Sequence, residues 1–336
     1  ARDGIPYVDV GTSDNVAWDQ PRVTVEFLTD AAATGSIGPQ LFNQMLLDTG
    51  ASTIIAMATA VSEMDDPPFP YTVEGKFEEL GVAGVQEFDI SAAYRLDFAG
   101  TNGERNTLLD VRIISDPVND FSQFGPWGVV GMPTMVDRVT TLDYTVWETV
   151  TGLDLFMGVE FSDTVPDDTG RRYTVEVDNR LEFEPEHGVV EGCCPPVWGD
   201  VSFLTAFPIH NGKAAEGNFL FDTGGQVSIL SERLALQIGL DSNGDGVLNE
   251  NDANFARFET VGGIGGAISV PVFLFDEVHV PTTSGVDLEW TDLQWLVLDI
   301  VEGLDGVFGS DLMTSGWVEG FATNGKSGWV DQIQLD

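Results

Sequence analysis

Residues 42–52 read Phe-Asn-Gln-Met-Leu-Leu-Asp-Thr-Gly-Ala-Ser, and residues 218–228 read Asn-Phe-Leu-Phe-Asp-Thr-Gly-Gly-Gln-Val-Ser. In each stretch a short apolar run, typical of a buried β-strand, leads directly into Asp-Thr-Gly, at Asp48 and at Asp222. Glycine and polar residues end the apolar run, as expected where a strand enters a tight turn. The two stretches therefore predict the same strand-and-turn unit at two places in the chain.

The sequence downstream of each stretch also repeats. Gly131 closes a Val-Val-Gly segment 83 residues after the first aspartate, and Gly309 closes a Val-Phe-Gly segment 87 residues after the second. Glycine-bearing turns that can head hairpins lie in between, at residues 81–84 and 262–266. Because the parts recur in the same order and at similar spacing, we predict that the chain carries two copies of one architecture.

The rest of the chain favours a mostly β fold with few short helices. Short runs rich in β-branched and aromatic residues recur between Gly, Asp, Asn and Pro, and few stretches show the helical period. The clearest helix spans residues 231–238, because Ser231 is a suitable N-cap and Gly239 a suitable stop. The predicted strands include residues 23–27, 94–98, 109–113, 173–177, 270–275 and 295–298.

The repeat predicts two lobes. We expect an N-terminal lobe over residues 1–185, which includes strands between the lobes, and a C-terminal lobe over residues 200–336. Residues 186–199, rich in Pro, Gly and Glu, are the expected connection. The last stretch, residues 317–335, is expected to complete the C-terminal lobe. A chain of 336 residues is long enough for two such cores.

Composition restricts the classes of function. Asp and Glu number 55 against 14 Lys and Arg, which gives a formal net charge of −41. This charge argues against a nucleic-acid partner, which needs a basic surface, and against anionic membranes. No apolar run approaches the roughly 18 residues of a membrane span. Because acid is abundant and lysine scarce, a secreted, extracellular or cell-surface location is expected.

The paired stretches resemble those of the bilobal aspartic endopeptidases, the pepsin-like and retropepsin-like superfamily, in a bacterial-type form. The resemblance runs from about Val23 to Leu312 and is carried by the two Asp-Thr-Gly loops and the two glycine segments. It implies two β lobes related by a pseudo-two-fold axis, with a central cleft between them. It also implies a monomeric hydrolase, a protease that binds an extended polypeptide substrate across the cleft.

The resemblance implies a specific use of paired carboxylates. Peptide hydrolysis without a metal or a covalent nucleophile needs one group that deprotonates water and one that protonates the carbonyl oxygen. Two carboxylates that share one proton can do both, so Asp48 and Asp222 would activate a water molecule between them, and catalysis would need no cofactor. In the family, the threonine ties the two loops together and the glycine lets backbone amides approach the carboxylates. The residues expected to support the loops are Thr49, Gly50, Thr223 and Gly224.

This chain departs from the pepsin-like pattern next to both aspartates. Ala51 and Gly225 stand where those enzymes usually carry Ser or Thr. Without a hydroxyl donor to the ionised carboxylate, the pKa values of the pair should rise, so we expect an activity optimum at mildly acidic to near-neutral pH. Pepsin-like enzymes also carry a tyrosine on a first-lobe hairpin. Tyr71 and Tyr94 are the candidates, but each is interpreted as an ordinary strand aromatic, which leaves residues 81–84 as the hairpin tip.

A third Asp-Thr-Gly occurs at residues 168–170. It follows Val-Pro-Asp-Asp rather than an apolar strand, and two arginines come next. We therefore predict a solvated turn there and exclude it from the site.

Residues 241–252 match a twelve-residue calcium loop of the dockerin or EF-hand type. Side-chain oxygens fall at positions 1, 3, 5, 9 and 12, a backbone carbonyl at position 7, and Gly246 at the sharp turn. The loop follows the predicted helix, so we expect Ca²⁺ to stabilise a surface insertion in the C-terminal lobe and to take no part in catalysis. The expected ligands are Asp241, Asn243, Asp245, Val247, Asn249 and Asp252.

Two other functions remain open at this point. The first is a catalytically silent peptide-binding or surface module of the same fold, stabilised by calcium, and the missing hydroxyls favour it. The second is a calcium-dependent structural domain whose Asp-Thr-Gly loops are simple turns. The second alternative does not explain why the glycine segments recur at nearly equal spacing.

Overall fold

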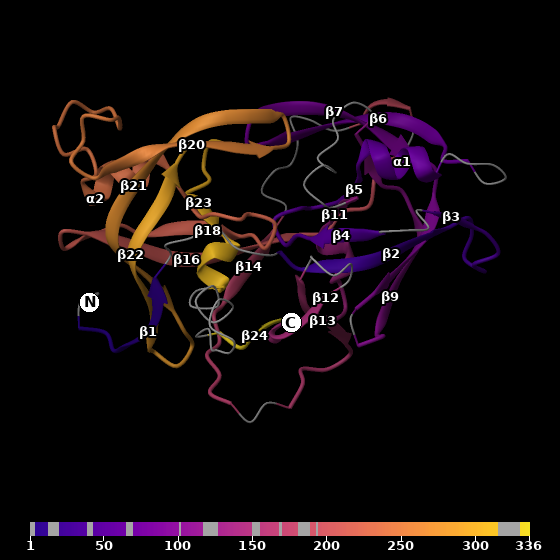
Figure 1. Cartoon of the computed structure of the whole chain (residues 1–336), viewed down its shortest axis with the longest axis horizontal. Coiled ribbons are helices and arrows are strands. Elements are labelled where there is room, and N and C mark those ends of the chain that lie inside the picture. The colour runs from indigo at the N-terminus through magenta and orange to yellow at the C-terminus, as the bar shows by residue number, and fades with distance from the viewer. Residues whose placement is uncertain are drawn as a thin grey trace. The chain divides into compact units, whose positions relative to one another are not determined.

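The computed structural model describes residues 4–12, 20–38, 43–64, 70–100, 102–116, 127–149, 155–167, 170–180, 189–192, 194–314 and 330–336. Most of the regular structure in these ranges is β-strand, with only short helices between strands (Figure 1). The mostly β fold expected from the sequence is therefore confirmed. None of the helices in these ranges has the length and apolar character needed to cross a membrane.

The chain divides into two compact units. The first, here called the Asp48 unit, comprises Asp19–Pro166, Leu181–Val201 and Gln332–Asp336. The second, the Asp222 unit, comprises Ala1–Trp18, Asp167–Arg180 and Ser202–Asp331. Each unit thus takes a segment from the far end of the chain, whereas the sequence analysis placed the lobes one after the other.

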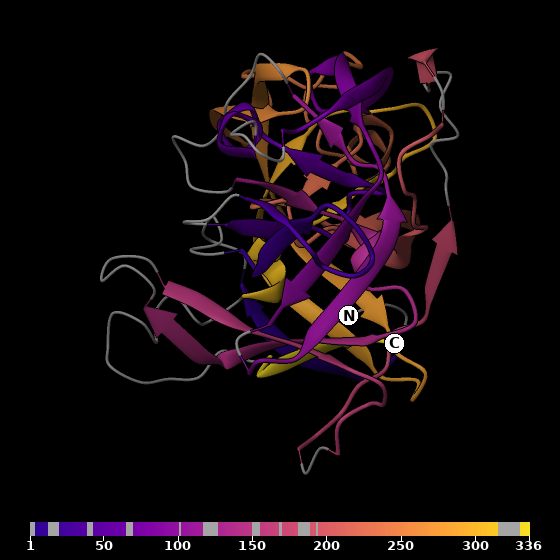
Figure 2. The same cartoon turned by 90° about the vertical axis from the view of Figure 1, so that its right-hand side faces the viewer.

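Strand pairing explains why the division differs from the expected boundaries. Strand β1 (Tyr7–Thr12) pairs in parallel with β22 (Asp287–Val297), which ties the start of the chain to the Asp222 unit (Figure 1). Strand β24 (Gln332–Leu335) pairs antiparallel with β12 (Val139–Thr149). Figure 2 shows β24 beside β12 and β13 (Leu155–Ser162), with which it forms a three-stranded sheet in the Asp48 unit. The expectation that the C-terminal stretch completes the other lobe is wrong for these residues.

The Asp48 unit is built on an 11-stranded sheet in the order β15-β6-β7-β10-β5-β11-β4-β2-β8-β9, with β3 paired to β2. Helix α1 (Ala58–Met64) follows β5, and a 3₁₀ turn, η2 (Met132–Thr134), follows β11. The strands of this sheet are β2 (Arg22–Leu28), β3 (Ser36–Gly38), β4 (Gln44–Leu47), β5 (Ile54–Ala56), β6 (Val73–Gly81), β7 (Gly84–Ser91), β8 (Tyr94–Ala99), β9 (Arg105–Val111), β10 (Ile114–Ser115), β11 (Gly128–Val130) and β15 (Val189–Gly192).

The Asp222 unit is built on a 10-stranded sheet in the order β1-β22-β19-β23-β18-β16-β21-β20, with β14 and β17 paired to β16. Helix α2 (Glu232–Ile238) follows β19, and α3 (Ser310–Met313) follows β23. Besides β1 and β22, its strands are β14 (Val177–Arg180), β16 (Val201–His210), β17 (Lys213–Ala214), β18 (Gly217–Phe221), β19 (Ile229–Leu230), β20 (Phe255–Gly263), β21 (Gly266–Pro281) and β23 (Gly306–Phe308).

The two sheets share one connectivity around their centres. Strand β11 lies parallel to β4 and antiparallel to β5, and β23 lies parallel to β18 and antiparallel to β19. A helix follows the strand after each aspartate, and a long hairpin comes next, β6–β7 in one unit and β20–β21 in the other. The internal repeat predicted from the sequence is therefore confirmed as a repeat of strand pairing within each unit.

Most of the predicted local elements are found. Helix α2 begins after Ser231, whose hydroxyl accepts the N–H of Leu234, and ends at Gly239, which has φ 87°. The predicted strand at residues 173–177 is wrong, because regular pairing starts only at β14. The Thr174 carbonyl accepts the Thr283 N–H, a single loop contact rather than a ladder. Of the third Asp-Thr-Gly, residues 168 and 169 lie outside the described residues.

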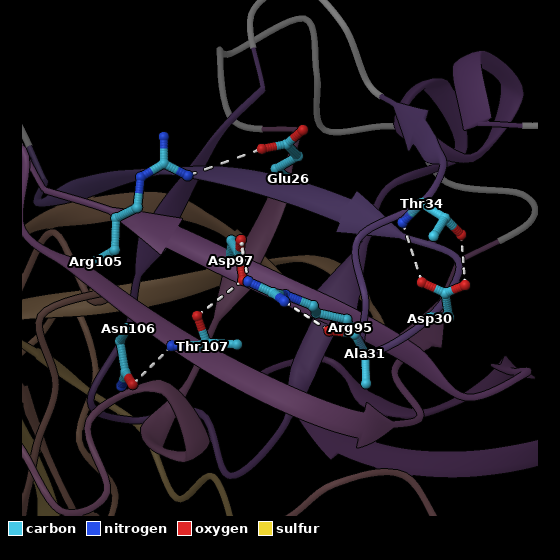
Figure 3. Close-up of polar contacts among 9 residues, drawn as sticks. All are labelled: Glu26, Asp30, Ala31, Thr34, Arg95, Asp97, Arg105, Asn106 and Thr107. Carbon is cyan, nitrogen blue, oxygen red and sulfur yellow. Dashed lines mark hydrogen bonds and ion pairs between the residues drawn. The ribbon is translucent and has the colours of Figure 1, made fainter.

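One partly buried carboxylate, Asp97, organises the β8–β9 edge of the Asp48 unit (Figure 3). The Arg95 guanidinium donates to both of its oxygens at 2.8 and 2.9 Å, and the Thr107 hydroxyl donates at 2.8 Å. Burial opposes ionisation, but the donors from Arg95 and Thr107 outweigh it and lower the pKa of Asp97. This edge of the sheet therefore depends on an ionised aspartate.

Candidate active site

The first Asp-Thr-Gly loop follows directly from the buried residues of β4. The Asp48 N–H donates to the Val130 carbonyl at 2.9 Å, which continues the β4–β11 ladder by one residue. The Gly50 N–H then donates to Asp48 Oδ1 at 2.7 Å. Asp48 is half-buried, so its carboxylate lies at the end of a core strand with a backbone donor already in place.

Close packing explains the Val-Val-Gly segment. A Cβ atom on Gly131 would lie 2.2 Å from the Ala51 carbonyl oxygen and 2.3 Å from that of Thr53. The same approach lets the Gly131 N–H donate to Thr53 O at 3.0 Å and the Met132 N–H donate to Ala51 O at 2.9 Å. Glycine is required here because the backbone at Gly131 packs directly against the backbone of residues 51–53. This contact holds the part of the loop that follows Asp48.

The second loop has the same construction in its own unit. The Asp222 N–H donates to the Phe308 carbonyl at 3.0 Å, which continues the parallel β18–β23 ladder by one residue. The N–H groups of Gly224 and Gly225 both donate to Asp222 Oδ1, each at 2.8 Å. Asp222 is half-buried. Each predicted catalytic aspartate therefore lies at the end of an equivalent strand and accepts the N–H of the glycine two residues later.

The predicted supporting threonines are both buried. Thr49 and Thr223 are almost inaccessible to solvent, as expected for residues that stabilise a loop from inside the core. The Thr223 carbonyl accepts the hydroxyl of Ser310 at 2.8 Å, which joins the second loop to the first turn of α3.

The second loop contains a buried polar network that the sequence analysis missed. The Ser228 hydroxyl donates to Asp311 Oδ1 at 2.7 Å and accepts the Gly309 N–H at 3.0 Å. Both side chains are buried. At the matching positions the first loop has Ile54 and Pro133, so its core is apolar there. The difference between Ser228 and Ile54, six residues after each aspartate, was the signal in the sequence.

Gly225 is one of the two positions, with Ala51, at which the sequence analysis predicts a missing hydroxyl donor. A Cβ atom there would lie 2.9 Å from Asp222 Oδ2, so the backbone passes directly over the carboxylate. The N–H of Gly225 therefore supplies a donor to Asp222 where a hydroxyl is missing. The loss of donors predicted for this loop is thus partly offset by the backbone.

The hairpin and tyrosine interpretations are consistent with the structure. Strands β6 and β7 are joined by a two-residue turn between Gly81 and Gly84, the latter with φ 115°. Tyr71 and Tyr94 are buried and stacked, with ring centroids 5.9 Å apart. The Tyr94 hydroxyl accepts the Thr72 N–H at 2.8 Å, and burial raises the pKa of Tyr71. Both tyrosines therefore belong to the core and not to a hairpin tip.

The predicted calcium loop forms a series of tight turns in which side-chain oxygens accept backbone N–H groups. Asp241 accepts Gly244 and Gly246 through its two oxygens, at 2.7 and 2.8 Å. Asn243 accepts Asp245 at 2.8 Å, and Gly246 has φ 81°, as the predicted sharp turn requires. Carboxylate and amide oxygens are the donors that Ca²⁺ prefers, so the donor set suits that ion.

The last ligand position is the most enclosed. Asp252 is buried, and its oxygens accept the N–H groups of Ser242 at 2.8 Å and Asn249 at 3.0 Å. Burial opposes ionisation, but these N–H donors outweigh it and lower the pKa of Asp252. In the described part of the chain, one group of three His, Cys, Asp or Glu residues has its ligand atoms within 4.8 Å of one another. That group lies outside this loop. Calcium binding by the loop stays a prediction.

Comparisons with known proteins give structural likenesses alone. No protein-family model and no curated protein matches the sequence. Among solved structures, the chain is similar to the aspartic proteinase from Irpex lacteus, at 10% identity and a TM-score of 0.44, over 88% of this chain and 92% of that one. It is also similar to basic 7S globulin from soybean, at 9% identity and a TM-score of 0.43, with the same coverage of both chains. At these TM-scores the likenesses do not decide the function, which is argued from the two aspartate loops.

Proposed function

We propose that the chain is an aspartic endopeptidase that hydrolyses peptide bonds in extended polypeptides. The observation that carries this proposal is the backbone arrangement that the two Asp-Thr-Gly loops share. Each aspartate ends a core strand beside a parallel glycine strand and accepts the N–H of the glycine two residues later. A turn that merely capped a strand would not need this arrangement in both units.

In the proposed mechanism Asp48 and Asp222 face one water molecule and share one proton. The ionised carboxylate takes a proton from the water as it attacks the peptide carbonyl, and the neutral one protonates the carbonyl oxygen. Two like charges close together cannot both ionise easily, so one carboxylate would hold the shared proton while the other stays ionised. The glycine N–H donors hold each carboxylate in orientation before substrate arrives.

The residues beside the aspartates set the expected pH range. Ala51 has no hydroxyl, and Gly225 donates to Asp222 only through its backbone. With fewer donors to the ionised form, the pair should work best at mildly acidic to near-neutral pH. A pH–rate profile that peaks below about pH 3 would contradict this part of the proposal.

The same proposal includes three further assignments. A structural Ca²⁺ in the loop at 241–252 would bind only the folded Asp222 unit and so stabilise it. A secreted or cell-surface location and a monomeric state fit a chain that carries both aspartates and a strong negative charge.

The direct test is digestion of an unstructured protein from about pH 3 to about pH 8, read by mass spectrometry. Asp48→Asn and Asp222→Asn should each abolish cleavage. Asp168→Asn is the matched control, since it changes the same tripeptide outside the proposed site and should leave cleavage unchanged. If the parent cleaves nothing at any pH with Ca²⁺ present, the alternative of a silent peptide-binding module is favoured instead.

A further inference from the structure

Two glutamates and a histidine gather on the Asp222 unit, outside the proposed site. Glu277 and His279 lie two residues apart on β21, so their side chains share one face of the sheet. Glu289 lies directly opposite His279 on β22. The His279 Nε2 atom is 3.1 Å from Glu277 Oε2 and 2.9 Å from Glu289 Oε2. The three ligand atoms all lie within 4.8 Å of one another.

The cluster is enclosed, and its hydrogen bonding is incomplete. The side chain of His279 is 0% exposed and that of Glu289 is 7% exposed, whereas Glu277, at 26%, reaches the surface. Two buried atoms have no hydrogen-bond partner, namely His279 Nδ1 and Glu289 Oε2. The short contact between Glu289 and the imidazole therefore lacks the geometry of a hydrogen bond. Buried polar atoms without partners are costly, so the arrangement calls for a further binding species.

The local charge indicates that this species is a cation. A second buried carboxylate, Asp287, lies 3.5 Å from His279 Nδ1 and is 2% exposed. Three carboxylates thus surround a single imidazole in a chain of net charge −41. A cation bound among them would offset their mutual repulsion.

We propose that Glu277, His279 and Glu289 form a site for one divalent transition-metal ion of the Zn²⁺ type. Zn²⁺ binds imidazole nitrogen and carboxylate oxygen at about 2.0–2.2 Å, which places tetrahedral donor atoms about 3.3–3.6 Å apart. The observed spacings of 2.9 and 3.1 Å are shorter than this, so the carboxylates would move slightly apart to admit the ion. The mixed nitrogen and oxygen donors suit first-row metals better than Ca²⁺, which takes oxygen ligands.

Metal on Nε2 would make Nδ1, which has no hydrogen-bond partner, a hydrogen-bond donor. A histidine that binds metal through Nε2 carries its proton on Nδ1 and usually donates it to a carboxylate, which fixes the ring. Asp287 is the group in position to accept that proton. The ring is further held by Tyr7 of β1, at a centroid distance of 6.0 Å in an edge contact. The ion would therefore tie β21 and β22 together next to the N-terminal strand.

The test measures metal bound to the full chain at neutral pH, with Ca²⁺ present to occupy the predicted calcium loop. The chelator-treated protein is loaded with Zn²⁺ and desalted, and its zinc is counted by mass spectrometry. Affinity is then measured by competition with a chromophoric chelator. We expect one equivalent of zinc in the parent and a loss of affinity of at least about tenfold in Glu277→Gln and His279→Gln.

The variants separate ligand loss from misfolding. Glu277→Gln changes a partly exposed side chain, so its fold should persist, as circular dichroism would show. His210→Gln is the matched control, because it removes another buried histidine paired with a carboxylate, Asp276, at 3.1 Å. It should keep full zinc affinity.

Cobalt gives a second readout that does not depend on stability. Co²⁺ bound at this site should show visible d–d bands without the thiolate charge transfer that Cys194 would add, and His279→Gln should lose those bands. The proposal is overturned if the parent retains no zinc, in which case the cluster holds only protons. It is equally overturned if Glu277→Gln and His279→Gln bind zinc as well as the parent does.

Discussion

At the scale of single residues, close backbone contact explains which glycines the repeat preserves. Gly131 and Gly309 lie where a side chain would meet the loop that follows each aspartate. At Gly309 a Cβ atom would lie 2.8 Å from the Val227 carbonyl carbon and 3.0 Å from the buried carboxylate of Asp311. The spacing of these glycines from the aspartates is thus set by packing within each unit.

Gly309→Ala should therefore destabilise the Asp222 unit by roughly 2 kcal/mol, because the added methyl has no space in a packed core. Gly262→Ala is the matched control, since a Cβ atom on Gly262 meets nothing within 4 Å. Chemical denaturation of both variants would measure the difference. Equal midpoints for the two would show that contact with the loop does not constrain Gly309.

At the scale of elements, the β8–β9 edge depends on charge. The pKa of Asp97 is lowered in the folded state. Ionised Asp97 therefore stabilises the fold above its ordinary pKa of 3.8, and this stabilisation is lost as the pH falls through the lower folded-state pKa. Asp97→Asn should cost about 1.5–3 kcal/mol near neutral pH, since hydrogen bonds to a charged group are lost. The difference between parent and variant should shrink below about pH 4. Urea unfolding of parent and variant at several pH values would test this. Glu87→Gln, which changes an exposed side chain, is the control, and its stability difference from the parent should not change with pH. If the difference between the parent and Asp97→Asn stays the same in acid, the charge of Asp97 is not its cause.

The calcium loop is a second element with its own prediction. Adding Ca²⁺ should raise the thermal midpoint of the parent, and Asp241→Ala should remove that rise because a ligand is lost. Glu250→Gln, inside the loop but outside the ligand positions, should respond as the parent does. Scanning calorimetry with and without a chelator would measure both. A chelator that abolished activity without changing the midpoint would contradict a purely structural ion.

At the scale of the whole molecule, the sequence predicted the elements that the two units have in common but not the two terminal strands that pair with the unit from the other end of the chain. The loops at Asp48 and Asp222, the glycine segments, helix α2 and both hairpins all have local signals, namely apolar runs, caps and turn residues. The exchange of β1 and β24 between units has none, because strand partners far apart in sequence leave no local pattern. The same limit hid the cluster at His279, whose third member comes from the neighbouring strand.

The most direct test of the central claim asks whether the two aspartate loops act as one site. Calorimetric titration with a statine-containing peptide, a mimic of the transition state for peptide hydrolysis, should give one equivalent bound per chain. Asp48→Asn and Asp222→Asn should each weaken that binding severely, although the two residues lie in different units. Binding that survives either substitution, or no binding by the parent at mildly acidic pH, would contradict a shared catalytic pair.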